Sequence, residues 1–121
     1  MNTSTPSEAK IIVPTVNGTH FFKPEEITRL EGNSNYTRIH FTNRKPLLMA
    51  KVLKKYEAVL APMGFLRIHQ SHLINMRYVS FVDAAGQLIM QDEQALTISR
   101  RKRKEVMQEL YLKNAAPLTA A

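Results

Sequence analysis

The chain has 121 residues, enough for a single domain, and its 44% hydrophobic and 22% charged residues are typical of a globular protein rather than a disordered one. The absence of Cys excludes disulfides, thiolate metal sites and cysteine nucleophiles. No apolar run is long enough for a membrane span or a secretory signal, so we expect a cytoplasmic protein. The formal net charge is +7, and residues 32–82 hold eight Lys or Arg against one Glu. This concentration favours a polyanionic partner, of which nucleic acid is the commonest.

Short strands dominate the elements predicted for the first half of the chain. An Asn17-Gly18 pair between two apolar runs is a strong signal for a β-hairpin. Further on, Thr37, Ile39 and Phe41 fall on one face of an alternating run, which is typical of a half-buried strand. The strands expected in this half are residues 11–13, 20–22, 27–30, 36–41 and 45–49.

The second half adds more strands of the same kind. They are expected at residues 65–69, 78–82, 87–91 and 95–98, with turns at 83–86 and 92–93. Strands this short and closely spaced favour antiparallel sheets over a βαβ fold. We interpret residues 1–9 as a disordered lead, residues 10–113 as one domain and residues 114–121 as a frayed tail.

Two segments have the apolar spacing of a helix. The first is expected at residues 51–60, before Pro62 and Gly64. Its apolar side consists of Val52, Leu53, Tyr56, Val59 and Leu60. The second is expected at residues 100–112, with Ser99 as its N-cap. Its apolar stripe consists of Val106, Met107, Leu110 and Tyr111. The predicted fold class is therefore mainly β, with two short helices.

The start of the second helix breaks an electrostatic rule. Residues 100–104 are all Lys or Arg, yet the N-terminal end of a helix carries partial positive charge, so each base there is unfavourable by about 0.3–1 kcal/mol. Lys102 also stands where a capping box has Glu or Gln. Such a pattern often marks function, and helix N–H groups with Arg side chains suit a phosphate. The alternative is a solvated basic helix end.

Catalysis has little support in the sequence. The carboxylates are scattered, and the four Gly residues form no glycine-rich phosphate loop. His69 and His72, even with His40 approaching across a sheet, lack the further ligands that a zinc site needs. We therefore expect no enzymatic activity, no metal, no cofactor and no small-molecule substrate.

Nucleic-acid binding has more support, although zinc-finger spacing, zipper heptads and RNP-type aromatic strings are missing. Three polar stretches remain, at residues 31–36, 67–72 and 99–101, and basic residues lie beside them. Asn and Gln side chains suit the adenine edge in the major groove, and Arg suits the guanine edge. Loops on a rigid β scaffold are where such side chains would be presented.

The same three stretches resemble the recurring strings of the LytTR DNA-binding domain found in bacterial response regulators. In chain order they read Glu31-Gly32-x-x-x-Tyr36, Phe65-x-Arg67-Ile68-His69-x-Ser71-x-x-Ile74-Asn75 and Ile98-Ser99-Arg100-Arg101-x-x-Lys104. The resemblance covers roughly residues 10–112, and its middle string is the most specific. It implies an elongated, mainly β domain of small packed antiparallel sheets. It also implies loop residues that enter successive major grooves of double-stranded DNA.

By position, the resemblance implies base contacts from Asn35, Gln70 and Arg100. The phosphate contacts would come from their basic neighbours Lys45, Lys51, Arg67, Arg101 and Lys102. Structural alternatives remain open for two of the base contacts: a left-handed turn residue at Asn35 and an ordinary exposed amide at Gln70. Hydrogen bonds to the backbone, rather than DNA contacts, are expected from His69, Ser71 and Asn75.

Two departures from the family pattern concern regulation and the last loop. Family members usually carry a receiver domain first, whereas only about ten polar residues precede the domain here, so we expect a free-standing domain without that switch. Lys102 stands where the family often has an aromatic residue.

The resulting hypothesis is a sequence-specific binder of double-stranded DNA that regulates transcription. Two copies on repeated half-sites are expected because one domain of this size has a limited footprint, and a regulatory protein partner is compatible with this role. The main alternative is a protein interaction module that acts on a signalling or membrane partner and has only non-specific affinity for nucleic acid. An RNA-binding β domain is less favoured because few aromatic residues are placed for base stacking.

Overall fold

The N-terminal hairpin forms where the Asn17-Gly18 pair predicts it. In the computed structural model, which describes residues 9–113, β1 (Ile11–Thr15) pairs antiparallel with β2 (Gly18–Phe22). The loop itself is Val16-Asn17, and Gly18 already begins β2, with a φ of 137°. The expected tail at 114–121 lies outside the described residues, as does the expected lead at 1–9 except for Ala9.

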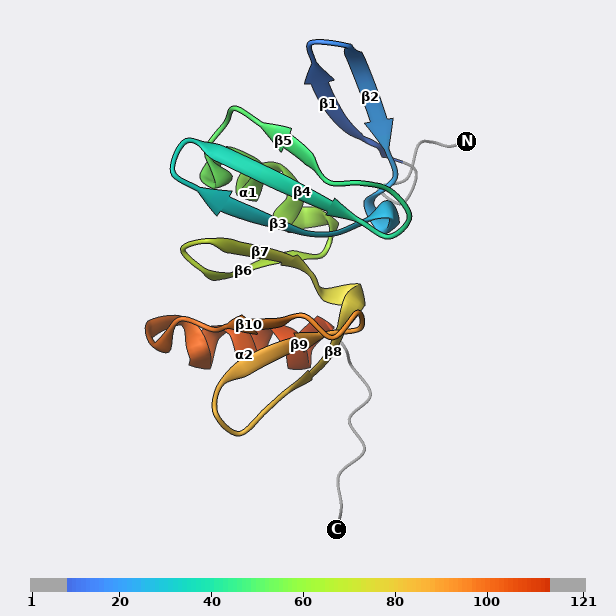
Figure 1. Cartoon of the computed structure of the whole chain (residues 1–121). Helices are drawn as coiled ribbons and strands as arrows, with labels where there is room; N and C mark the ends of the chain where they lie inside the picture. Colours follow the sequence, from blue (N-terminus) through green and yellow to red (C-terminus); the bar gives the residue numbers. More distant parts are fainter. Residues whose placement is uncertain (1–8, 114–121) are drawn as a thin grey trace.

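A five-stranded antiparallel sheet forms the centre of the fold (Figure 1). In spatial order its strands are β5 (Leu47–Met49), β4 (Tyr36–Phe41), β3 (Ile27–Asn33), β7 (His72–Asn75) and β6 (Phe65–His69). The predicted alternation of β4 is confirmed, since Thr37 and Ile39 are both buried. β3 is three residues longer than predicted because Glu31, Gly32 and Asn33 continue the antiparallel pairing with β4.

The sequence does not predict β7, which lies between β3 and β6 in the sheet. Leu73, Ile74 and Asn75 are consecutive and all buried. A strand covered on both faces has no polar side, so it lacks the period of two by which a half-buried strand is found.

The C-terminal part forms a separate three-stranded antiparallel sheet. In spatial order its strands are β10 (Ala95–Thr97), β9 (Gln87–Met90) and β8 (Val79–Val82). They match the predicted strands to within one residue at each end. A 3-10 turn, η4 (Met76–Tyr78), connects this sheet to β7. The mainly β, antiparallel fold class is thus confirmed.

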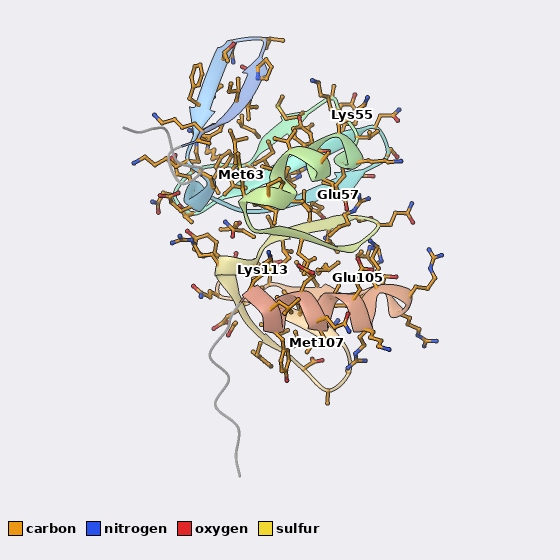
Figure 2. All side chains as sticks on the ribbon, turned by 180° about the vertical axis from the view of Figure 1, so that it is seen from behind. Lys55, Glu57, Met63, Glu105, Met107 and Lys113 are labelled. Atoms are coloured by element: carbon orange, nitrogen blue, oxygen red, sulfur yellow. The ribbon has the colours of Figure 1, made fainter. Side chains whose placement is uncertain are left out.

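Both predicted helices form, with later starts. α1 (Leu53–Leu60) begins two residues after the predicted position, because Val52 keeps an extended backbone with φ −73° and ψ 150°. The second helix opens as a 3-10 turn, η5 (Arg100–Lys102), and becomes α-helical at α2 (Arg103–Lys113). Ser99 precedes it as predicted, but its side chain makes no capping hydrogen bond. Figure 2 shows the molecule from behind, with α1 against the five-stranded sheet and α2 against the C-terminal part.

The predicted apolar sides of the helices are only partly correct. Leu53 and Leu60 of α1 are buried, as are Val106 and Leu110 of α2. Three of the residues assigned to these sides are instead exposed: Val52, Val59 and Tyr111. Each helix therefore buries a narrower stripe than its sequence indicates. Among residues 9–113, no helix is both long enough and apolar enough to cross a membrane.

Two hydrophobic cores share the β6–β7 hairpin. Phe65 and Leu73 belong to the core beneath α1, together with residues of β1–β5. Ile68 and Ile74, on the opposite face, belong to the core beneath α2, together with residues of β9 and β10. The hairpin is thus fixed on both faces, and its turn is held between the two halves of the molecule.

Asn75, at the end of β7, satisfies buried backbone groups. It is 4% exposed, and its Nδ2 donates to the Ile27 carbonyl at 2.9 Å and to the Pro24 carbonyl at 3.2 Å. Its Oδ1 accepts a hydrogen bond from the Arg77 N–H at 3.1 Å. These bonds connect segments about fifty residues apart, and this backbone role agrees with the sequence-based expectation.

We predict that Asn75→Ala lowers the free energy of unfolding by about 1–3 kcal/mol, because the buried carbonyls and N–H group lose their partner. Urea denaturation followed by circular dichroism measures the change. Asn43→Ala, at an exposed turn, is the matched control and should change stability by less than about 0.5 kcal/mol. Equal effects of the two substitutions would contradict this role for Asn75.

Candidate nucleic-acid interface

Three connections lie on one edge of the molecule, one above another at the left of Figure 1: the β3–β4 loop, the β6–β7 loop and the segment that leads into η5 and α2. They carry the three residues predicted to contact bases, Asn35, Gln70 and Arg100. All three of these residues are exposed. The fold therefore brings together three stretches that are about thirty residues apart in the sequence.

Backbone hydrogen bonds tie these connections to one another. The Gly32 N–H, at the end of β3, donates to the Ser71 carbonyl of the β6–β7 loop at 2.9 Å. The Ser99 N–H, just before η5, donates to the Ile68 carbonyl of β6 at 2.8 Å. The middle loop is thus anchored on both sides, which fixes the backbones of the three connections relative to one another.

The first loop is shaped by Gly32 and Ser34. A Cβ on Gly32 would lie 3.1 Å from Cβ of Leu53, so glycine lets β3 pass close to the first residue of α1. Ser34 adopts the left-handed conformation of the turn, with φ 56°. Asn35 is therefore not the left-handed turn residue that the sequence left open as an alternative, and its amide is exposed at the loop tip.

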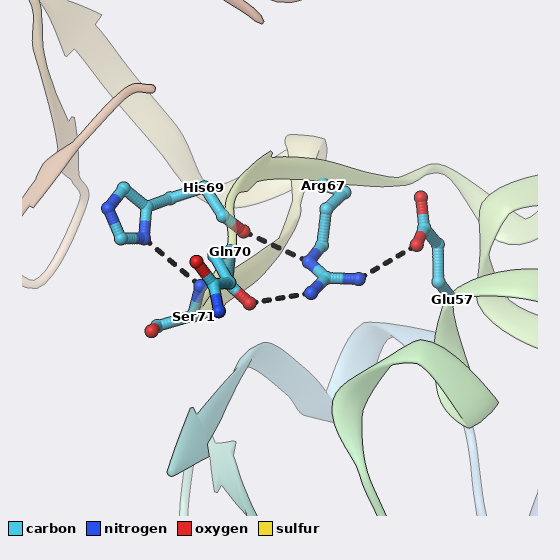
Figure 3. Close-up of polar contacts among 5 residues, drawn as sticks. All are labelled: Glu57, Arg67, His69, Gln70 and Ser71. Carbon is cyan, nitrogen blue, oxygen red and sulfur yellow. Dashed lines mark hydrogen bonds and ion pairs between the residues drawn. The ribbon is translucent and has the colours of Figure 1, made fainter. Parts of the chain in front are cut away.

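The middle loop is held by the Arg67 guanidinium (Figure 3). Its Nε donates to the His69 carbonyl at 2.9 Å, and its Nη2 donates to the Gln70 carbonyl. Its Nη1 donates to Oε1 of Glu57, on α1, at 2.8 Å. Three of the five N–H donors of the guanidinium are thus engaged, and the side chain is only 15% exposed. This geometry favours a role in positioning the loop over the phosphate contact expected from the sequence.

The third connection concentrates positive charge in one turn. Arg100 and Arg101 are exposed and Lys102 is half-buried. The Lys102 N–H donates to the Ser99 carbonyl at 3.0 Å, which closes the first turn of η5. The turn thus gathers three basic residues at the place where the sequence breaks the helix-dipole rule.

A pocket between α1 and η5 joins the second and third connections. It is lined by Lys54, Glu57, Arg67, His69, Gln70, Ser99, Arg101 and Lys102. Glu57 is the one acid in this lining and is already paired with Arg67, so the charges of Lys54, Arg101 and Lys102 are left for a ligand. The sequence does not single out Lys54 as a candidate contact, because its position beside Lys55 is typical of a solvated helix face. Only the packing of α1 beside the β6–β7 loop places it in this pocket.

Two of the predicted phosphate contacts lie at opposite ends of the sheet. Lys51 follows β5 near the start of β4, where its carbonyl accepts a hydrogen bond from the Thr37 hydroxyl at 2.7 Å. Lys45 lies in the connection after Phe41, the last residue of β4. The structure therefore brings Lys51 to the end of the sheet that carries the loops, but does not bring Lys45 there.

A second polar cluster covers the open face of the five-stranded sheet. The pocket there is lined by Glu31, Gly32, Asn33, Tyr36, Arg38, His40, Leu48, His69, Ser71 and His72. Nε2 of His40 donates to Oε1 of Glu31 at 3.1 Å. The same carboxylate oxygen lies 3.8 Å from Nη1 of Arg29, which is only 7% exposed.

Burial sets the protonation of this cluster. It lowers the pKa of His40, and the charge of Arg29 lowers it further, against the opposing effect of Glu31. Burial also lowers the pKa of His72, with a further contribution from His69. For Glu31, burial acts to raise the pKa, but the hydrogen bond from His40 and the charge of Arg29 outweigh it and lower the pKa. At neutral pH the His40–Glu31 contact is therefore a hydrogen bond from a neutral imidazole to a carboxylate.

The three histidines that line this pocket do not form a metal centre. Within residues 9–113, no group of three or more His, Cys, Asp or Glu side chains is placed to hold a metal ion.

Comparison with known proteins identifies the domain. The family model of the LytTr DNA-binding domain matches residues 17–111, most of the chain. This chain belongs to the LytTR family. The family is a DNA-binding family without catalytic activity, which agrees with the expectation from the sequence. The three connections described above all lie within the matched segment.

Individual relatives of this LytTR domain support the assignment. The transcriptional regulatory protein LytR of Staphylococcus aureus, from strains N315 and NCTC 8325 / PS 47, is 35% identical over 63 residues. The match covers 52% of this chain and 25% of LytR, so this chain matches a quarter of that protein's length. A solved LytTr DNA-binding domain, from a Bacillus cereus protein described as a methyl-accepting/DNA response regulator, has the same fold with a TM-score of 0.69. It is 17% identical, and the alignment covers 85% of this chain and 97% of that one.

We predict that the LytTR domain loses stability as the pH falls from 7 to 5.5. Its unfolded histidines take up protons near pH 6.5, whereas folded His40 and His72, whose pKa values are lowered, resist protonation. The unfolded state therefore binds more protons in this range, and the free energy of unfolding decreases. Urea midpoints measured across the range test this.

The double variant His40→Gln and His72→Gln is the control for this pH dependence. Its urea midpoint should change less with pH than that of the wild type, because the two shifted groups are gone. An unchanged slope would show that other groups cause the acid sensitivity.

Proposed function

We propose that this LytTR domain binds double-stranded DNA in a sequence-specific manner and thereby regulates transcription. The observation that carries the proposal is the single edge on which three exposed polar loops are joined by backbone hydrogen bonds. Loops that are already ordered lose little conformational entropy on binding, which favours selective recognition. The name of the matching LytR proteins, transcriptional regulatory protein, supports the regulatory part.

In this proposal the loop side chains read base edges in the major groove. The amides of Asn35 and Gln70 are exposed and suit an adenine, whose N6 donates and whose N7 accepts. The guanidinium of Arg100 suits the O6 and N7 acceptors of a guanine. Each side chain comes from a different connection, so each addresses a different base pair.

The phosphate contacts in this proposal are Lys51, Lys54, Arg101 and Lys102. Lys54, Arg101 and Lys102 line one pocket whose acid is already neutralised, which suits a phosphate group. Lys45 is left out because it lies at the other end of β4, and Arg67 because its guanidinium holds the middle loop.

Two copies of the domain on repeated half-sites are part of the proposal. The interface formed by three short loops is small for a regulator that must select one site among many, and a second copy multiplies the selectivity. The spacing of the half-sites then follows from the helical repeat of DNA.

Selection from random duplex DNA at near-physiological salt tests the proposal. A repeated motif that binds much more tightly than a scrambled duplex is the expected outcome. Failure to enrich any motif, with binding that disappears as salt rises, would contradict base reading. It would instead favour an interaction module with incidental basic charge.

We predict that Arg100→Ala weakens binding to the selected site by about 1–3 kcal/mol and relaxes the preference at one base pair, since a bidentate guanine contact is lost. Fluorescence anisotropy on the selected duplex and its single-base variants measures both effects. Arg44→Ala removes the same charge from the β4–β5 connection, where Arg44 lies 5.0 Å from the Phe22 ring centroid. This control should change binding little, and a uniform loss on all sequences in Arg100→Ala would indicate a phosphate contact instead.

We predict that Arg101→Ala weakens binding to all duplexes alike and lowers the slope of log Kd against log salt by about 0.9, the value for one released counterion. Titrations at several salt concentrations, on selected and scrambled duplexes, measure the slope. Lys113→Ala, at the far end of α2, is the charge-matched control and should leave the slope unchanged. Selective loss of one base preference in Arg101→Ala would contradict the assignment.

A further inference from the structure

The turn that carries Gln70 is closed by an imidazole. The Ser71 N–H donates to Nδ1 of His69 at 3.0 Å, so the bond spans Gln70 from one side to the other (Figure 3). The carbonyls of His69 and Gln70 are held at the same time by Arg67. The backbone on both sides of Gln70 is therefore fixed by hydrogen bonds to side chains.

The bond to Ser71 requires one particular form of the His69 ring. A backbone N–H can only donate, so Nδ1 must present its lone pair, and the proton of the neutral ring must be on Nε2. An imidazolium carries protons on both nitrogens and cannot accept this bond. Protonation of His69 would therefore release the Ser71 N–H and open the turn at Gln70.

Most of the charged groups that face His69 are positive. The His72 ring, on β7, lies with its centroid 5.4 Å from that of His69. The charged and titratable groups that share the two pockets with His69 are Lys54 and Glu57 of α1, Arg67 of β6, Arg101 and Lys102 of η5, Glu31 of β3, and Tyr36, Arg38 and His40 of β4. Both acids among them are already paired, Glu57 with Arg67 and Glu31 with His40.

We propose that His69 is a positioning residue for Gln70, and that its neutral imidazole is required for full sequence-specific DNA affinity. The inference rests on the proposed function, since it takes Gln70 as a base contact. It assigns to His69 no contact with DNA, and it makes recognition at this one loop sensitive to acid. A direct phosphate contact by the imidazolium would have the opposite pH dependence, because acid would then tighten binding.

The ring form is tested in the free protein by NMR of its imidazole nitrogens. At pH 7.5 we expect His69 to carry its proton on Nε2, with an unprotonated Nδ1, and the Ser71 amide resonance to move as His69 is protonated. A proton on Nδ1 at pH 7.5 would overturn the proposal. This measurement needs no DNA, so its outcome is independent of whether the domain reads bases.

The positioning role is tested by affinity for the selected duplex. His69→Ala should bind about three- to tenfold more weakly at pH 7.5, the loss of roughly one hydrogen bond. His69→Asn should restore most of that loss, because the Asn Oδ1 accepts a bond from the N–H two residues on. In a Gln70→Ala background, His69→Ala should have little further effect, since the residue that it positions is gone. Additive effects of the two substitutions would overturn the proposal.

The pH profile separates positioning from a merely structural role. Between pH 7.5 and 5.5 the wild type should lose affinity relative to His69→Asn, whereas His20→Asn, on the distant β1–β2 hairpin, should keep the wild-type profile. Circular dichroism at each pH confirms that the proteins are folded. Wild-type affinity that rises in acid relative to His69→Asn would overturn the proposal. If no duplex is selected at all, the proposed function fails, while the NMR result on the ring form still stands.

Discussion

The burial of the β6–β7 hairpin on both faces is the constraint on which the rest of the structure depends. Phe65 and Leu73 pack into the core under α1, while Ile68 and Ile74 pack into the core under α2. The hairpin thus joins two small cores into one body, and neither half has to bury all its apolar surface alone. Because both strands are fixed, the turn between them cannot shift without disturbing both cores. The middle loop of the candidate interface is therefore anchored by both cores.

Hydrogen bonds extend this order from the hairpin to its neighbours. The Gly32 and Ser99 N–H groups donate to carbonyls at the two sides of the middle loop, and Arg67 holds the carbonyls within it. Backbone groups in loops need partners as much as those in strands do, and here the partners come from adjacent loops. The result is an edge whose three connections are ordered together before any ligand binds.

The acidic side chains near the candidate interface already have partners within the protein. Glu57 is the one acid among residues 32–82, and it is bound to Arg67. Glu31 faces His40 and the buried Arg29. The bases at the interface therefore keep their charge for a ligand, although the basic start of the second helix is unfavourable for helix stability. Lys54, Arg101 and Lys102 of the basic pocket thus contribute part of the net charge of +7 on the edge that carries the three connections.

The sequence by itself determined the fold class, the β1–β2 hairpin, the alternation of β4, the approximate bounds of both helices and three polar stretches, because these depend on local periodicity and turn chemistry. It did not reveal β7, whose consecutive buried residues have no period of two. It also did not show that Lys54 lies beside the β6–β7 loop whereas Lys45 lies at the other end of β4. Nor did it show that Arg67 is bound to Glu57. Those features depend on contacts between segments far apart in the chain, and only the tertiary structure decided them, because packing α1 beside the β6–β7 loop creates both the basic pocket and the bonds that fix the loop.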